Sequence, residues 1–152
     1  MQTILLGSDH GGFKLKEKIK IYLERSRFKI RDVGTYSQDS CDYPVFAANL
    51  AKLISQGKYK RGILICKSGI GNSIVANRFP RVRAALCYNV TAARLSRAHN
   101  DSNVLVMGSI FVNTEGAKKI VKAWISTKFQ GGRHKRRLNR IENIEKESRG
   151  AR

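Results

Sequence analysis

Apolar and polar positions follow two recurring patterns along the chain. Short, almost continuous apolar runs occupy residues 4–6, 28–33, 62–66, 84–87 and 104–107. Between these runs, apolar residues recur three or four positions apart, most clearly over residues 117–125. The apolar runs predict five β-strands, and the three- and four-residue spacing is typical of the buried face of an amphipathic helix.

The order of these elements predicts the fold class. Strands alternate with helices, and the strands are apolar at consecutive positions rather than at every second position. Such strands are buried on both faces, which is typical of a parallel sheet between two layers of helices. Because 152 residues fit one domain, we predict a single α/β domain over residues 1–147.

The carboxyl-terminal segment differs from the rest of the chain. Residues 131–147 are polar and basic, and they carry Leu138, Ile141 and Ile144 at three-residue intervals. This narrow apolar stripe predicts a helix that packs either on a second subunit or on its own domain. We expect residues 148–152 to be frayed.

The chain is strongly basic. It has 30 Lys and Arg residues against 11 Asp and Glu residues, which gives a formal net charge of +19. Such a charge attracts polyanions. However, the basic residues are spread over the whole chain, without a helix-turn-helix, zinc-knuckle or aromatic RNA-binding pattern. We therefore expect a solvated basic surface, a few arginines that bind phosphate, and no specific nucleic-acid partner.

Several features predict a cytoplasmic protein without a membrane anchor. No apolar stretch reaches the roughly 18 residues of a membrane helix, and the first residues lack the basic segment of a signal peptide. The three cysteines, Cys41, Cys66 and Cys87, are odd in number and widely spaced. This spacing fits neither a metal site nor a disulfide framework, so we expect reduced thiols.

The loop after the third predicted strand is the sharpest candidate for chemistry. Cys66 is followed by glycines at positions 69 and 71 and then by a helical stretch. Glycines allow a tight turn whose backbone N–H groups converge, and such a nest at a helix start stabilises negative charge. The same field lowers the pKa of a thiol. The alternative is that Cys66 is simply a small buried residue, the commoner role of a cysteine at a strand end.

Two histidines and two arginines add to this candidate site. His10 follows the first strand and His99 precedes the fifth, and we expect them at neighbouring strand ends. With Asp9 they predict acid–base chemistry, although solvated loop histidines or a metal site are alternatives. Arg133 and Arg137 are four residues apart, so one helix face would carry two guanidiniums that suit a phosphate. A solvated basic face is the alternative for this pair.

Six motifs occur in order along the chain. They are GSDHGGFKLK at 7–16, DVGTY at 32–36, DYP at 42–44, ILICKSGIG at 63–71, LSRAHNDSNV at 95–104 and GGRH at 131–134. In combination they resemble the type B ribose-5-phosphate isomerases, a group within the ribose/galactose isomerase family. The resemblance runs to about residue 147 and implies a Rossmann-like, three-layer α/β/α sandwich with a five-stranded parallel sheet.

The resemblance also implies an activity and the residues that perform it. The implied reaction is the aldose–ketose isomerisation of ribose 5-phosphate and ribulose 5-phosphate, through an enediolate and without a metal or cofactor. Cys66 would be the general base, Ser68 would help to move hydroxyl protons, and His99 with Asp9 would open the furanose ring. For substrate binding, the resemblance implies that the backbone around Lys67, Gly69, Ile70 and Gly71 holds the enediolate. It implies that the phosphate is bound by His10, Arg133 and Arg137, and that the sugar site is lined by Tyr43 and Asn100.

Members of this family share their pocket between the two chains of a homodimer, so His99 and Asn100 are expected to face the Cys66 loop of a partner. The resemblance is compatible with a homodimer or with a tetramer of paired dimers. Two positions depart from the family pattern: Lys67 replaces a usual glycine, and Ile110 replaces a frequent arginine. We expect Lys67 to lie at the pocket mouth and partly to replace that cation. The alternatives are an isomerase of a six-carbon sugar phosphate, of the allose- or galactose-6-phosphate type, and a non-catalytic sugar-phosphate-binding module.

Overall fold

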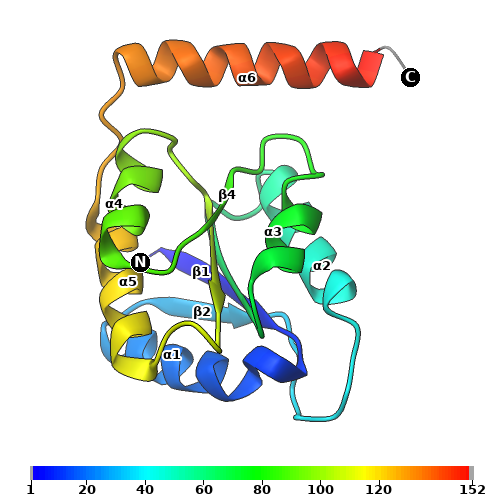
Figure 1. Ribbon diagram of the computed structural model, residues 1–152, viewed down its shortest axis with the longest axis vertical. Helices are drawn as coiled ribbons and strands as arrows, with labels where there is room; N and C mark the ends of the chain where they lie inside the picture. The colour runs from blue at the N-terminus through cyan, green and yellow to red at the C-terminus, as the bar shows by residue number, and fades with distance from the viewer. Residues whose placement is uncertain (1, 151–152) are drawn as a thin grey trace.

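The computed structural model describes residues 2–150 and contains the five strands predicted from the apolar runs, with ends that differ by at most two residues. These strands are β1 (Thr3–Ser8), β2 (Lys29–Asp32), β3 (Arg61–Cys66), β4 (Ala84–Leu86) and β5 (Val104–Gly108). All neighbouring strands are parallel, in the order β2-β1-β3-β5-β4 (Figure 1).

Helices cover both faces of this sheet, which confirms the three-layer α/β/α sandwich (Figure 1). One layer contains α1 (Phe13–Arg25), α4 (Val90–Ala98) and α5 (Thr114–Ser126), and the other contains α2 (Tyr43–Ser55) and α3 (Ile70–Ala76). Consecutive strand residues point to opposite layers: Ile4 and Leu6 join the first core, whereas Leu5 joins the second. Both faces of each central strand are therefore buried, as the unbroken apolar runs predict.

The strand order places a topological switch point between β1 and β3. From β1 the chain passes to β2 on one side, whereas from β3 it passes towards β5 and β4 on the other. The loops that follow β1 and β3 consequently leave the sheet in opposite directions and open a crevice at their carboxyl ends, which is where open α/β sheets bind ligands. The short 3-10 helix η1 (His10–Gly12) and α3 begin at this crevice.

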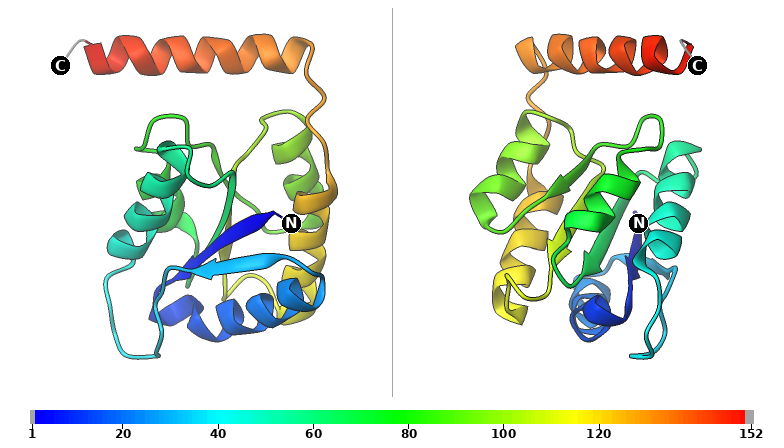
Figure 2. Two further views of the ribbon diagram at one scale, coloured as in Figure 1. Left: turned by 180° about the vertical axis from the view of Figure 1, so that it is seen from behind. Right: turned by 45° about the vertical axis from the view of Figure 1, so that its right-hand side comes forward.

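The last helix, α6 (Arg133–Gly150), lies apart from the sandwich, beyond the amino ends of the strands (Figures 1 and 2). Its apolar stripe packs only in part on its own chain, since Leu138 is buried but Ile141 and Ile144 are 54% and 64% exposed. Residues 148–150 continue α6, and Arg149 donates hydrogen bonds to the Arg78 carbonyl and to Glu145. Residues 151–152 lie outside the described part.

Among residues 2–150, every helix is too short or too polar to cross a bilayer.

Candidate active site

The loop after β3 surrounds the Cys66 thiol with backbone donors. Gly69 has a φ of 82°, a left-handed conformation, and its N–H donates to Cys66 Sγ over 3.0 Å. A Cβ at position 69 would also lie 2.5 Å from a methyl group of Leu86. Backbone conformation and space therefore both require glycine here. The Ser68 hydroxyl accepts the Ile70 N–H over 3.2 Å, which fixes the turn that starts α3.

Burial decides the protonation of Cys66. The residue is 4% exposed, and burial raises the pKa of its thiol above the ordinary value of 9.0. Hydrogen bonds from the loop amides act in the opposite direction, and the nearby Asp9 carboxylate raises the pKa further. The expectation of a lowered thiol pKa is therefore wrong for the isolated chain: the amides do stabilise the thiolate, but desolvation outweighs them.

The loop after β1 packs directly against the Cys66 loop. A Cβ at Gly12 would lie 2.5 Å from the Ile65 carbonyl carbon, so only glycine allows η1 to approach β3 this closely. Asp9 is 6% exposed and accepts the Gly12 N–H over 3.0 Å. The Ser109 hydroxyl, just after β5, donates to the Gly11 carbonyl over 2.8 Å. These contacts bring the Asp9 carboxylate to the thiol as a fixed neighbour.

His10 lies at the exposed rim of the same crevice. Its Nδ1 accepts the backbone N–H of Cys41 over 3.2 Å. An accepting Nδ1 places the proton of a neutral imidazole on Nε2, which is then a donor available to a phosphate. The orienting role of Cys41 was not predicted, and the only sequence signal for it is its position next to the DYP motif.

Tyr43 and Gly71 form a third wall. Tyr43 begins α2, and a Cβ at Gly71 would lie 2.6 Å from the Tyr43 hydroxyl oxygen. The tyrosine ring therefore covers the Gly71 backbone directly. The residue is 38% exposed, so its side chain lines the crevice rather than the core.

The two positions that depart from the family pattern are neighbours. The Ile110 N–H donates to the Lys67 carbonyl over 3.1 Å, and both side chains are exposed at the carboxyl ends of β3 and β5. A cation at position 67 consequently lies next to the position where one is absent.

The remaining predicted residues form a second group at the opposite end of the molecule. His99 caps α4 and stacks on His134 of α6, with ring centroids 4.1 Å apart. Asn100 follows His99, and Arg133 and Arg137 are exposed on the first turns of α6, on one face as predicted. Burial, the neighbouring His99 and the charges of both arginines lower the pKa of His134.

These two groups cannot meet within one chain. The register pairs Gly62 with Val104 and Cys66 with Gly108. Cys66 therefore lies four residues from the level where β5 begins, about 13 Å along the sheet. Since His99 precedes β5, it lies beyond the amino end of that strand. The expectation that His10 and His99 occupy neighbouring strand ends is therefore wrong. In a parallel sheet, a residue that precedes a strand and a residue that follows a neighbouring strand lie at opposite edges of the sheet.

Comparison with known proteins gives a consistent result. The model of the family described as Ribose/Galactose Isomerase matches residues 4–141. Ribose-5-phosphate isomerase B of Escherichia coli is 44% identical over 145 residues, which cover 95% of this chain and 97% of that protein. The chain belongs to the ribose/galactose isomerase family.

Solved structures of this family agree with the fold. The ribose-5-phosphate isomerase B of Clostridium thermocellum superimposes with a TM-score of 0.95 at 44% identity, over 97% of this chain and 99% of that one. The Mycoplasma genitalium enzyme, solved with bound ribulose-5-phosphate, superimposes with a TM-score of 0.91 at 38% identity, over 95% and 97% of the two chains. Across the described part of this family member, no group of three or more His, Cys, Asp or Glu side chains is arranged to hold a metal ion.

Proposed function

We propose that this family member is an aldose–ketose isomerase that interconverts ribose 5-phosphate and ribulose 5-phosphate, in a site shared between two copies of the chain. The observation that carries the proposal is the thiol–amide loop of Cys66 at the switch point of the sheet. Its support is the close similarity to a family structure that holds ribulose-5-phosphate. A buried base beside converging N–H donors suits the removal of a proton next to a carbonyl group.

The reaction requires one base and one oxyanion site. The Cys66 thiolate takes the proton from C2 of the open-chain aldose, and the electron pair moves into an enediolate whose oxygens face the N–H groups of residues 67–71. The proton then returns to C1, while Ser68 passes a hydroxyl proton from O2 to O1. No electrons leave the substrate, so the balance needs no redox partner.

The raised pKa of Cys66 gives the second copy a chemical role. At neutral pH the isolated chain holds a protonated thiol, because burial and the Asp9 carboxylate oppose the thiolate. Cations brought to the crevice by a second copy would favour the charged form of the thiol. We expect Arg133 and Arg137 to act in this way when they bind the substrate phosphate beside His10. His99 of the same second copy would reach the ring oxygen of the furanose, and Asn100 its hydroxyl groups.

Two surface features support such an assembly. Several apolar side chains are exposed on α3 and after β4 and β5: Ile70 (49%), Ile74 (54%), Tyr88 (43%) and Phe111 (53%). A groove of about 750 Å³ separates α6 from the sandwich and is lined by Leu138, Ile141 and Ile144. An apolar face and a half-covered helix stripe are typical of surfaces that a second subunit buries.

An isomerase assay on the purified full chain tests this proposal. Wild-type protein should convert ribose 5-phosphate to ribulose 5-phosphate, and in D₂O it should place solvent deuterium at C1 of the product, because the base exchanges its proton with solvent. Allose 6-phosphate and galactose 6-phosphate are the comparison substrates, since Lys67 and Ile110 alter the charge at the site. A higher kcat/KM on either six-carbon sugar would reassign the substrate. Absence of turnover on all three substrates would favour the alternative that the protein is a non-catalytic sugar-phosphate-binding module.

A further inference from the structure

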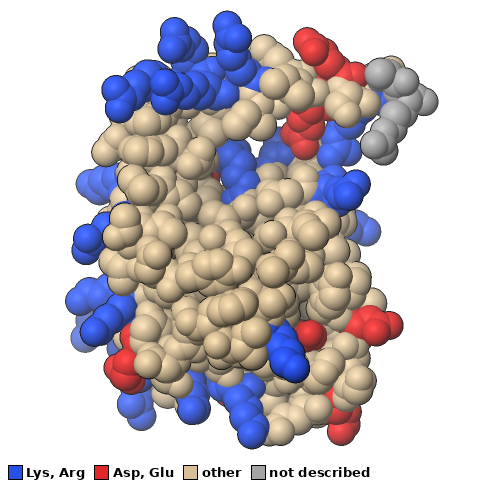
Figure 3. All heavy atoms as spheres, viewed as in Figure 1, with Lys and Arg blue, Asp and Glu red and all other residues tan. Residues whose placement is uncertain are grey.

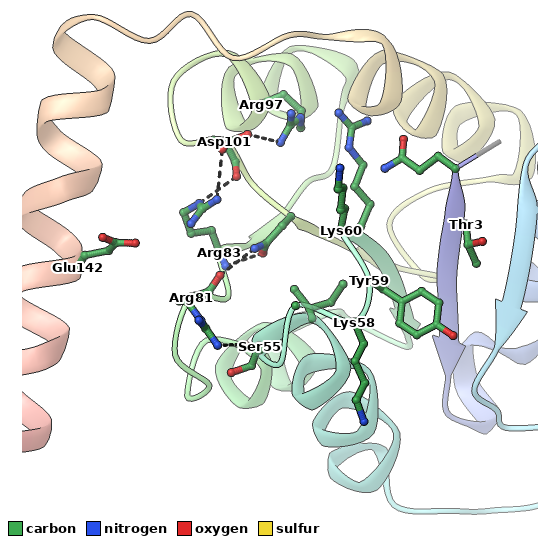
Figure 4. A pocket seen from close by; sticks show the side chains of 15 residues that line it. Thr3, Ser55, Lys58, Tyr59, Lys60, Arg81, Arg83, Arg97, Asp101 and Glu142 are labelled. Carbon is green, nitrogen blue, oxygen red and sulfur yellow. Dashed lines mark hydrogen bonds and ion pairs between the residues drawn. The ribbon is translucent and has the colours of Figure 1, made fainter.

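A second cavity, of about 1050 Å³, lies at the amino ends of the strands, opposite the crevice of Cys66 (Figure 4). Its volume is at the upper end of the range of small-molecule sites. Two carboxylates line it, those of Asp101 and of Glu142 on α6. Six cationic side chains also line it: Lys58, Lys60, Arg61, Arg81, Arg83 and Arg97. Lys and Arg side chains also flank the hollow beneath α6 in Figure 3.

The cationic charge of this cavity is only partly neutralised. Arg83 and Arg97 share one carboxylate, Asp101, over 3.3 and 2.8 Å (Figure 4). Arg61 donates to the Ile125 carbonyl over 2.8 Å and Arg81 to the Ser55 carbonyl. The carbonyl groups accept hydrogen bonds from these guanidiniums but do not neutralise their positive charge.

The two lysines add uncompensated charge. Lys58 and Lys60 are exposed, and within residues 2–150 no carboxylate lies within ion-pair distance of either ammonium group.

Arg97 is a buried lining residue with one donor unpaired among the described residues. The residue is 6% exposed, and its Nη1 donates to Asp101 and, over 2.6 Å, to the Ser102 carbonyl. Its Nε is buried and has no hydrogen-bond partner in the part of the chain described. A buried donor without an acceptor is costly, and native proteins have few of them. Burial, and next the positive charge of Arg97, lower the pKa of Arg61, so the two like charges are close enough to repel.

We infer that this cavity binds a compact anion with more than one phosphate group, of the class of pyrophosphate or a nucleoside diphosphate. Lys60 and Arg61 supply cations at the start of β3, and Arg83 and Arg97 supply them from the segments before β4 and β5. A cavity of about 1050 Å³ is much larger than a single phosphate, so two linked phosphates can contact more of these cations at once. Guanidinium groups in particular match phosphate oxygens with paired N–H donors.

Calorimetric titration of pyrophosphate into the full chain tests the inference. Saturating ribose 5-phosphate is present throughout and occupies the proposed isomerase site. The heat released on adding pyrophosphate then measures binding to the cavity. Lys60→Glu reverses one exposed charge of the cavity without disturbing the core. Lys18→Glu makes the same change in net charge on the exposed face of α1 and is the matched control. Circular dichroism confirms that both variants fold, and their kcat/KM on ribose 5-phosphate should equal that of the wild type.

Wild-type protein and Lys18→Glu should bind pyrophosphate alike, and Lys60→Glu should raise its Kd at least about tenfold, the loss of a charge-assisted contact. Orthophosphate should bind at least about tenfold more weakly than pyrophosphate, since it contacts fewer of the cations and carries less charge. ADP that binds more tightly than pyrophosphate would identify a nucleoside diphosphate, and equal affinity would identify the phosphate chain alone; both support the inference. Equal weakening in the two variants, no binding by the wild type, or orthophosphate affinity equal to that of pyrophosphate would overturn it.

Discussion

Mixing two inactive variants should restore activity, because the structure separates the proposed catalytic groups into two sets. Cys66 and Asp9 lie at the carboxyl ends of the strands, and His99 lies beyond the amino end of β5, about 13 Å or more along the sheet. A general base must lie within about 3.2 Å of the proton it takes. Base and ring-opening group can therefore act on one sugar only if they come from different chains.

The size of the rescue follows from the symmetry of a dimer. We expect Cys66→Ala and His99→Asn each to be inactive alone. After equal mixing and full exchange, about half of the dimers contain one chain of each kind, and one of their two sites regains both groups. Activity should therefore approach about a quarter of the wild-type value, the fraction of sites that are intact.

The assay is ribose 5-phosphate isomerisation after exchange has been verified by native mass spectrometry of differently tagged chains. Cys66→Ala mixed with Asp9→Asn is the control, because both residues belong to one set and no mixed site is complete. This control mixture should stay inactive. Verified exchange of Cys66→Ala with His99→Asn and no gain in turnover would refute the shared site.

Three further predictions concern single positions. Lys67→Gly should raise the KM several-fold with little change in kcat, because an exposed cation at the crevice contributes about 1 kcal/mol or less to phosphate binding. An unchanged KM would show that Lys67 does not contact the phosphate, and so would a difference in KM between the two proteins that added salt does not narrow. Gly12→Ala should lower the free energy of unfolding by about 3 kcal/mol in urea titrations, because its Cβ meets the Ile65 backbone, which cannot move aside; a loss below about 1 kcal/mol would mean that the loop adjusts. In substrate-free protein, alkylation of Cys66, followed by mass spectrometry of its peptide, should accelerate about tenfold per pH unit from pH 7 to 9, because burial raises the pKa of the thiol and we expect Arg133 and Arg137 to favour the thiolate only when they bind phosphate. A plateau below pH 8 would contradict the raised pKa.

The fold was predictable because its signal is local. Each central strand is buried on both faces, so its apolar residues are consecutive, and each covering helix shows a stripe at helical spacing. The residues of the crevice were predictable for a similar reason: Asp9, Cys66 and Gly69 lie at the end of a strand or within three residues of it, and the carboxyl ends of parallel strands meet at one edge.

Features set by tertiary contacts were not predictable in the same way. The raised pKa of Cys66 depends on how deeply neighbouring loops bury the thiol, whereas the sequence reveals only the amides that oppose this effect. The contact of Cys41 with His10 joins residues 31 positions apart and depends on the path of a loop without periodicity. The hydrogen bond from Arg149 to the Arg78 carbonyl likewise joins residues 71 positions apart in the sequence.

The turnover of Cys66→Ala on ribose 5-phosphate tests the central claim most directly. No other side chain in its loop can carry the carbon-bound proton, so kcat should fall about 100-fold or more. Circular dichroism and the thermal midpoint should show that the fold survives, since the change removes only one sulfur atom. A folded Cys66→Ala protein that retains more than about a tenth of the wild-type kcat would contradict the assignment of Cys66 as the base.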